Sequence, residues 1–277
     1  MIFALAFAGA LHAQDRFSWT QPIAPFRIVG NVHYVGTQGL AAYLITTPER
    51  HILINSNTED TVPLIRESVE KLGFRLSDVK ILLISHAHWD HCGGSAQIKS
   101  LTGARYMVME SDVSTVESGG KDDFHYGQSQ DSHFKPVKVD RVLHDGDTVK
   151  LGDTVLVAHL TPGHTRGCTT WSMAVREGEK TYQVVIIGSP NVNQGYKLVD
   201  NPQYPQIASD YEKTFQVLKS LACDVFLGAH GDYFGMEGKM KAGQPNPFID
   251  PDGYKSYVAE REQAFRSEWK KQRATAE

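Results

Sequence analysis

Cysteine is scarce in this sequence, and charge of one sign is hardly in excess. The three cysteines allow at most one disulfide, which excludes a disulfide-stabilised scaffold. The 28 basic residues are nearly balanced by 32 acidic ones, so the formal net charge is −4 and no global positive field attracts nucleic acid. Long hydrophobic runs are also missing: no segment of the sequence reaches the roughly 20 apolar residues that a membrane-spanning helix needs. We therefore expect neither nucleic acid as a partner nor a membrane anchor.

The chain has the length and composition of a globular protein. Its 277 residues, of which 41% are hydrophobic, suffice for a large domain with its own core. Residues 2–11 are apolar or small, and residues 10–13 resemble the cleavage region of a secretory signal peptide, although no basic residue precedes the apolar run. We expect residues 1–13 to be such a signal peptide, either complete or truncated at its start, with an N-terminal strand or tail as the alternative. Residues 14–277 are then expected to form a single domain that is periplasmic or secreted.

Hydrophobic periodicity predicts a mixed α/β chain. Four strand-like segments come first, at residues 27–29, 32–35, 41–45 and 51–54, and an amphipathic helix that ends at Gly73 follows them. The remaining elements are a buried strand at 81–84, short strands between 142 and 187 and at 225–227, and helices around 211–221 and 254–269. Mixed sheets covered by helices suit this order better than a pure barrel or bundle. The polar stretch at 118–139 is long enough to predict a functional loop or lid.

Histidine is the unusual component of the sequence, with 12 copies. Four potential metal ligands lie within six residues directly after the buried strand, namely His86, His88, Asp90 and His91. Open α/β sheets present their active sites at this end of a strand. One tetrahedral zinc takes about four ligands, and a catalytic zinc leaves one position to water, so this density of ligands predicts two metal ions. His164 and His230 also follow predicted strands and lie beside glycines, which makes them candidates for the same site.

The arrangement of these ligands resembles that of a known family. The motif His-x-His-x-Asp-His at 86–91, the turn Thr-Pro-Gly-His-Thr-x-Gly at 161–167 and the strand-end His230 are similar to the pattern of the metallo-β-lactamase superfamily, and most of all to its third subclass of zinc-dependent β-lactamases. The resemblance runs from about Ser18 to the final helix. It implies a four-layer αββα sandwich with mixed sheets, helices on the outer faces and two Zn²⁺ ions at one edge. The ligands that it implies are His86, His88 and His164 for the first zinc, and Asp90, His91 and His230 for the second.

The resemblance also implies an activity. The protein would open the β-lactam ring of penicillins, cephalosporins and carbapenems by attack of a zinc-bound hydroxide that Asp90 orients. Tyr196 would contact the carbonyl oxygen of the substrate, and Ser189 and Asn191 would bind its carboxylate. The alternative is a dizinc hydrolase of another ester, thioester or lactone. Ser189 favours the lactamase, because related thioesterases carry at this position an Asp that bridges the two metals.

The sequence departs from the usual pattern of the superfamily at one position that bears on the metal ligands. Asn55 occupies the end of a predicted strand where the superfamily usually has an Asp that supports the metal ligands. Groups that support metal ligands tune the affinity of the site, so we expect the metal affinity or the pH behaviour of this protein to differ from that of its relatives. A monomer is the expected state for a chain of this size.

Overall fold

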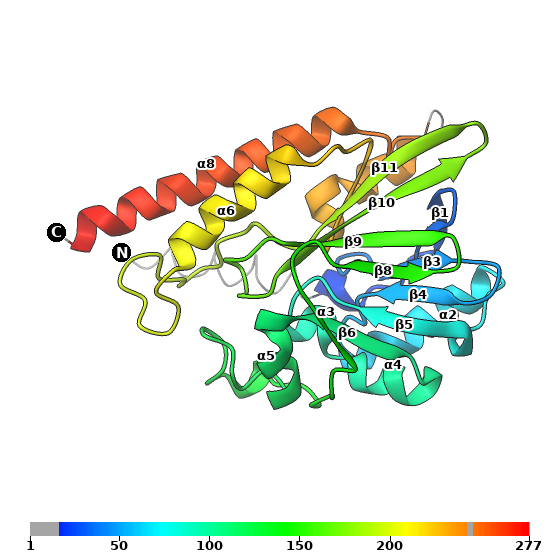
Figure 1. The fold of residues 1–277 in the computed structure, drawn as a ribbon, viewed down its shortest axis with the longest axis horizontal. Coiled ribbons are helices and arrows are strands. Elements are labelled where there is room, and N and C mark those ends of the chain that lie inside the picture. Colours follow the sequence, from blue (N-terminus) through cyan, green and yellow to red (C-terminus); the bar gives the residue numbers. More distant parts are fainter. Residues whose placement is uncertain (1–16, 243–245, 277) are drawn as a thin grey trace.

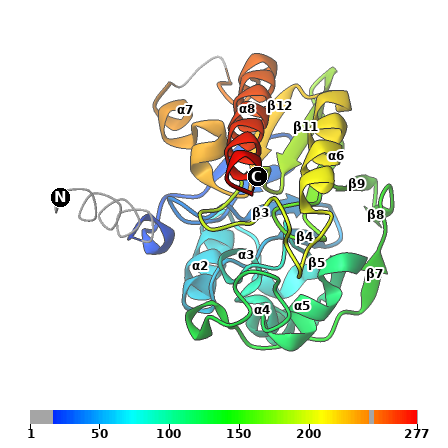
Figure 2. The same ribbon diagram turned by 90° about the vertical axis from the view of Figure 1, so that its left-hand side faces the viewer.

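The chain folds into two β-sheets that pack face to face, with helices on both outer sides (Figure 1). The computed structural model describes residues 17–242 and 246–276, so the signal peptide predicted at residues 1–13 lies outside the described residues. An end-on view shows α6 and α8 over one sheet and α2, α4 and α5 over the other (Figure 2). This arrangement confirms the predicted αββα sandwich. The helices named here are α2 (Val62–Lys71), α4 (Ser95–Thr102), α5 (Val113–Ser118), α6 (Ile207–Ser220) and α8 (Pro251–Ala276).

The first sheet has seven strands in sequence order, antiparallel from β1 to β4 and parallel from β4 to β7. Ile81 and Leu83 of β5 face the core between the sheets, whereas Leu82 packs beneath the helices on the outer side. Burial on both faces explains why β5 is a continuous apolar run. The strands are β1 (Phe26–Val29), β2 (Val32–Tyr34), β3 (Tyr43–Thr46), β4 (His51–Ile54), β5 (Val79–Leu83), β6 (Arg105–Met109) and β7 (Arg141–Leu143).

The second sheet has five strands in the order β12-β11-β10-β9-β8. Only β11 and β12 run parallel, and the other neighbours are antiparallel. Its strands fall close to the segments that the sequence predicts. They are β8 (Thr148–Leu151), β9 (Thr154–Leu160), β10 (Thr169–Glu177), β11 (Lys180–Ile187) and β12 (Val225–Gly228).

Helices α6 and α8 cover the second sheet with aromatic side chains. Tyr211 and Phe215 of α6 are buried, and the ring of Tyr211 stacks on Phe265 of α8 at a centroid distance of 5.2 Å. Burying a side chain such as Phe contributes about 1.5–3 kcal/mol. Within the described ranges, no helix is both long enough and apolar enough to cross a membrane. The shorter helical elements are α3 (Trp89–Cys92), α7 (Met236–Ala242), η1 (Glu59–Thr61), η2 (Leu76–Asp78), η3 (Glu110–Asp112), η4 (Gln130–Ser132) and η5 (Gly231–Phe234).

The two sheets meet at the edge where the loops after β5, β9 and β12 lie. The backbone N–H of Thr169, at the start of β10, donates to the carbonyl of Ser85, which follows β5, at 2.7 Å. On the other side, Leu40 forms a β-bridge with His230 beyond β12. These backbone links bring three loops that are distant in the sequence to one place. Each of the three loops carries predicted metal ligands.

Candidate metal centre

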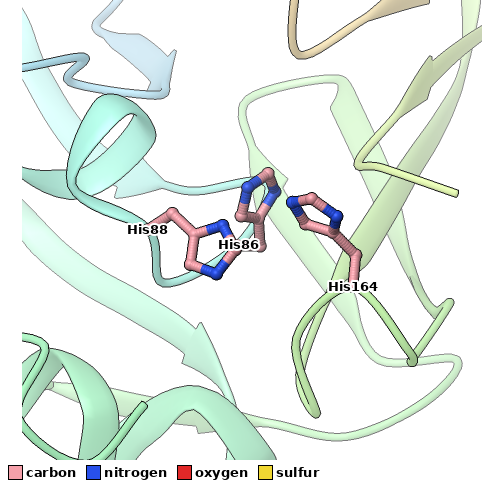
Figure 3. Close-up of side chains that lie close together, drawn as sticks. All are labelled: His86, His88 and His164. Atoms are coloured by element: carbon pink, nitrogen blue, oxygen red, sulfur yellow. The ribbon is translucent and has the colours of Figure 1, made fainter. Parts of the chain in front are cut away.

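The first group of predicted ligands lies together in the structure. His86 and His88, from the loop after β5, meet His164, from the loop after β9, with one ring nitrogen of each within 4.8 Å of the others (Figure 3). All three side chains are buried. Neither ring nitrogen of His86 finds a hydrogen-bond partner among the described residues. Leaving a buried polar atom unpaired costs about 1–3 kcal/mol, and a metal ion bound to one of these nitrogens would remove the cost at that atom. Three imidazoles with a free fourth position are a donor set that suits catalytic zinc.

The second group lies directly beside the first. The Nε2 atom of His91 lies 3.2 Å from Oδ2 of Asp90 and 3.1 Å from Nε2 of His230, and the latter atom is 3.4 Å from the same Asp90 oxygen. Ligand atoms of His86, Asp90 and His91 also lie within 4.8 Å of one another, so the two groups adjoin. Two imidazoles and one carboxylate again suit zinc. We call the two sets the first cluster (His86, His88, His164) and the second cluster (Asp90, His91, His230).

Local backbone geometry explains how one short motif serves two clusters. His88 is in an extended conformation, and α3 begins at the next residue. Side chains two apart on an extended segment point to the same side, which directs His86 and His88 to the first cluster. The turn of α3 rotates Asp90 and His91 toward His230. The change from extended backbone at His88 to helix at Trp89 therefore divides the motif between the two clusters.

Two of the predicted ligands, His86 and Asp90, are in the protonation states that bind metal. Burial and the neighbouring His91 and His164 lower the pKa of His86 well below its usual value. Burial opposes ionisation of Asp90, but the adjacent His91 and His230 outweigh it and hold the pKa of the carboxyl well below its usual range. His86 is therefore neutral and Asp90 ionised at neutral pH. Metal binding requires these deprotonated forms.

Asn191 and Tyr196, which the sequence suggests as substrate contacts, instead contact His164. The Nδ1 atom of His164 donates to the carbonyl oxygen of Asn191 at 2.8 Å, which leaves Nε2 for a metal. The hydroxyl of Tyr196 donates to the carbonyl oxygen of His164 at 2.9 Å, and Tyr196 is only 2% exposed. Neither residue belongs to the described lining of the pocket. Asn191 thus supports His164 through its backbone and Tyr196 through its hydroxyl, and the substrate contacts expected of both residues remain predictions.

Asp112 is a supporting residue that the sequence pattern did not reveal. Its buried carboxylate accepts hydrogen bonds from the N–H of Ala87 at 2.9 Å, the hydroxyl of Thr165 at 2.8 Å and the N–H of Gly167 at 2.8 Å. Ala87 lies between His86 and His88, and Thr165 follows His164, so Asp112 joins the two loops of the first cluster. A Cβ atom at Gly167 would lie 2.7 Å from the carboxyl carbon of Asp112. Thr165 and Gly167 of the turn motif were the available signal in the sequence, because both donate hydrogen bonds to the buried carboxylate of Asp112.

The side chain of Asn55 forms hydrogen bonds that require an amide and that the usual Asp could not form. Its Nδ2 donates to the carbonyl of Ala41 at 3.1 Å and to the hydroxyl of Ser85 at 3.0 Å, while its Oδ1 accepts from the N–H of Ser85 at 2.8 Å. A carboxylate has no N–H to donate to the Ala41 carbonyl. The amide thus holds the start of the ligand loop from both sides. A difference in metal affinity or pH behaviour remains a prediction.

A pocket of about 870 Å³ opens above both clusters. His88, Asp90, His164 and His230 contribute to its lining, and the aromatic side chains of Trp19, Trp89, Tyr126 and Tyr233 form much of its wall. No lysine or arginine is among the described residues that line it. Ser189 is buried, but its hydroxyl lies 3.1 Å from that of Tyr233. The sequence pattern did not reveal Tyr233, whose only signal was its position three residues after a ligand.

Comparisons with known proteins agree with this geometry. Residues 36–175 match the pattern of the Metallo-beta-lactamase superfamily. The native FEZ-1 metallo-beta-lactamase from Legionella gormanii is 56% identical, with a TM-score of 0.90 over 92% of this chain and 98% of that one. BJP-1, a subclass B3 metallo-beta-lactamase of Bradyrhizobium japonicum, is 39% identical, with a TM-score of 0.87 over 94% of this chain and 98% of that one.

Curated relatives are more distant. A hydroxyacylglutathione hydrolase of Rhodopseudomonas palustris is 28% identical over 123 residues, which are 44% of this chain and 39% of that protein. The chain spans less than half the length of the curated relatives that it matches first. Both solved structures, in contrast, are covered almost completely.

Proposed function

Because the chain belongs to the metallo-β-lactamase superfamily, we propose that it is a dizinc hydrolase that opens the β-lactam ring of penicillins, cephalosporins and carbapenems. The observation that carries this proposal is the pair of adjoining His/Asp clusters below one pocket. The high identity to a metallo-beta-lactamase over nearly all of its length supports the choice of substrate. Because the chain also matches a hydroxyacylglutathione hydrolase distantly, a thioester is the alternative substrate that has to be tested.

The six predicted ligands divide between two ions. His86, His88 and His164 would hold the first zinc. Asp90, His91 and His230 would hold the second. When bound, the two ions would polarise the lactam carbonyl, lower the pKa of water to about 7 and so supply a nucleophile at neutral pH.

Asp90 has a second role besides that of a ligand. Its carboxylate lines the pocket and is ionised at neutral pH. An ionised carboxylate accepts hydrogen bonds only, so Asp90 can accept one from the attacking water and orient its lone pair toward the carbonyl carbon. Holding a reactant in this way removes much of the entropic barrier of an attack between two free molecules. Asp90 is therefore the catalytic residue in this proposal.

The wall of the pocket determines how the substrate is held. Because the described lining contains no lysine or arginine, neutral side chains are the donors that the pocket wall offers to the carboxylate of a β-lactam. The hydroxyls of Ser189 and Tyr233, which lie 3.1 Å apart, are the donors that we propose for it; of the two, Tyr233 belongs to the described lining of the pocket, and Ser189 is buried behind it. Trp19, Trp89 and Tyr126 offer an apolar surface to the substituents of the ring.

The test is hydrolysis of one penicillin, one cephalosporin and one carbapenem by the purified protein, with a glutathione thioester as the competing substrate. We expect turnover of the three β-lactams that a zinc chelator abolishes and added zinc restores. Turnover of the thioester alone by the protein with two zinc ions would overturn the β-lactamase assignment and leave the metal centre intact.

The state and location of the protein are part of the same proposal. We propose that it acts as a monomer on a small-molecule substrate, without nucleic acid or a membrane anchor, in the periplasm or outside the cell. The apolar residues 2–11 support export. Size-exclusion chromatography with light scattering tests the monomer, and the first residue of the protein recovered from a periplasmic extract tests the signal peptide.

A further inference from the structure

Asp123, in the loop between α5 and η4, uses both oxygens of its carboxylate. Its Oδ1 accepts hydrogen bonds from the backbone N–H groups of His125 at 2.8 Å and Tyr126 at 2.6 Å. Its Oδ2 lies 3.5 Å from Nε2 of His88. The side chains of Asp123 and His88 are only 5% and 4% exposed, so solvent competes little for either group. Asp123 is therefore a buried acid between the loop and a metal ligand.

The ring of His88 is placed between this acid and the first cluster. One of its nitrogens lies within 4.8 Å of ligand nitrogens of His86 and His164, and Figure 3 shows the three rings close together. An imidazole that binds a metal through one nitrogen usually donates its other N–H to a carboxylate or carbonyl, which sets the tautomer and the ring orientation. With Nε2 facing Asp123, Nδ1 is the nitrogen left for the metal. In the neighbouring His164 the two nitrogens exchange roles, because Nδ1 donates to the carbonyl oxygen of Asn191 and Nε2 is left for the metal.

The same acid holds part of the pocket wall. Tyr126, whose N–H is bound by Asp123, places its ring 5.2 Å from that of His88 and 5.4 Å from that of Trp89. The amide of Asn193 donates to the Tyr126 hydroxyl at 3.0 Å. Tyr126, Trp89 and Asn193 all line the pocket. A change at Asp123 therefore reaches both the first cluster and the wall above it.

We propose that Asp123 is a positioning residue that keeps the proton of His88 on Nε2, presents Nδ1 to the first zinc and ties this ligand to the Tyr126 wall. This inference rests on the proposed dizinc function. It assigns to the loop predicted at 118–139 a role in building the metal centre, in addition to any role in covering the substrate.

The variant Asp123→Asn separates this role from simple packing. Its amide oxygen can still accept the two backbone N–H groups, but its NH₂ group would face Nε2 of His88 and require that atom to be an acceptor. The proton of His88 would then sit on Nδ1, the atom that the metal needs. We expect the affinity of the first cluster for zinc, measured against a competing chelator, to fall roughly 10–100-fold, and the visible spectrum of the cobalt-substituted protein to change.

The matched control is Asp122→Asn. Asp122 is the exposed neighbour, and its backbone N–H donates to the hydroxyl of Ser118. We expect this variant to retain the wild-type zinc affinity and cobalt spectrum. Wild-type affinity and spectrum in Asp123→Asn would overturn the proposal, as would an equal loss in both variants.

A measurement on the wild-type protein covers the case in which Asp123→Asn does not fold. Nitrogen-15 NMR of the zinc-loaded protein locates the imidazole protons, and we expect that of His88 on Nε2. A proton on Nδ1 would overturn the proposal. These readouts need no substrate, so a protein that binds two zinc ions without hydrolysing β-lactams would refute the proposed function while the role of Asp123 is still decided.

Discussion

The two metal clusters of this protein are held by different means. The first cluster is supported by side chains from elsewhere in the chain, since Asp112 joins its two loops and Tyr196 holds the turn of His164. The second cluster is supported mainly by backbone, because Asp90 and His91 share one turn of α3 and His230 is placed by its β-bridge to Leu40. The side chain of His230 is 17% exposed, whereas His86 is 1% exposed. Both clusters contribute two residues to the pocket lining, and His230 makes the second cluster the more solvent-exposed of the two.

The largest effect is expected from Asp90→Asn in the second cluster. The substitution removes the carboxylate that binds a metal and orients water, so we expect kcat/KM for a β-lactam to fall about 10²–10⁴-fold. The melting temperature should change little, because the backbone of α3 remains as it is. Steady-state kinetics, zinc stoichiometry and a melting curve check this together. Full activity in a folded variant with two zinc ions would contradict both roles of Asp90.

Asp112→Asn tests the side-chain support of the first cluster. The amide of this variant has only one acceptor oxygen for the three groups that donate to the carboxylate of Asp112. Its NH₂ group would also face at least one of these donors instead of an acceptor. We expect the free energy of unfolding to fall by about 1.5–3 kcal/mol and zinc to be lost from the first cluster before the second. Denaturant unfolding and chelator titration measure the two effects. Asp153→Asn, an exposed acid in the turn between β8 and β9, is the control, and equal zinc loss from both clusters would remove the distinction between them.

The smallest effect is expected from Gly167→Ala. Its new methyl group would lie 2.6 Å from the backbone nitrogen of Asp112 and 2.7 Å from its carboxyl carbon, so Asp112 must shift. Such overpacking costs about 1–3 kcal/mol. Gly238→Ala in α7 is the matched control, because no described atom outside its chain neighbours and its own helix backbone lies within 4 Å of the added Cβ. In a helix, alanine is favoured over glycine by about 0.5–1 kcal/mol. Denaturant unfolding of the two variants should give changes of opposite sign, and equal stabilities would argue that the contact with Asp112 does not require glycine.

The sequence was sufficient for the strands and helices of the fold because each follows a local pattern, and the resemblance to a known family implied how they are layered. The apolar run of β5 predicts a strand buried on both faces, and the spacing of Tyr211, Phe215 and Leu218 predicts a helix with one buried side. The ligand residues were visible for a similar reason. Four of them lie in six consecutive residues, and imidazoles and carboxylates seldom gather so densely after a buried strand unless they bind metal.

The sequence was less informative about the residues that contact the substrate. Asn191 and Tyr196 lie in a segment whose direction depends on the turn at His164, and the direction of a side chain in a loop follows no periodicity. Tyr233 reaches the pocket because η5 turns the chain after His230. None of these orientations can be read from spacing.

The sequence by itself predicted mixed sheets covered by helices and four potential metal ligands after a buried strand, because periodicity and ligand density are properties of short segments. Its resemblance to a known family implied the αββα layering and added His164 and His230 to the predicted ligands. Only the tertiary structure decided what holds those ligands. The carboxylate of Asp112 bonds partners 25, 53 and 55 residues away, and Asp123 meets His88 from a separate loop. Such contacts exist only after the two sheets have packed, since a single acid in a loop carries no local sign of the buried partner that it will meet.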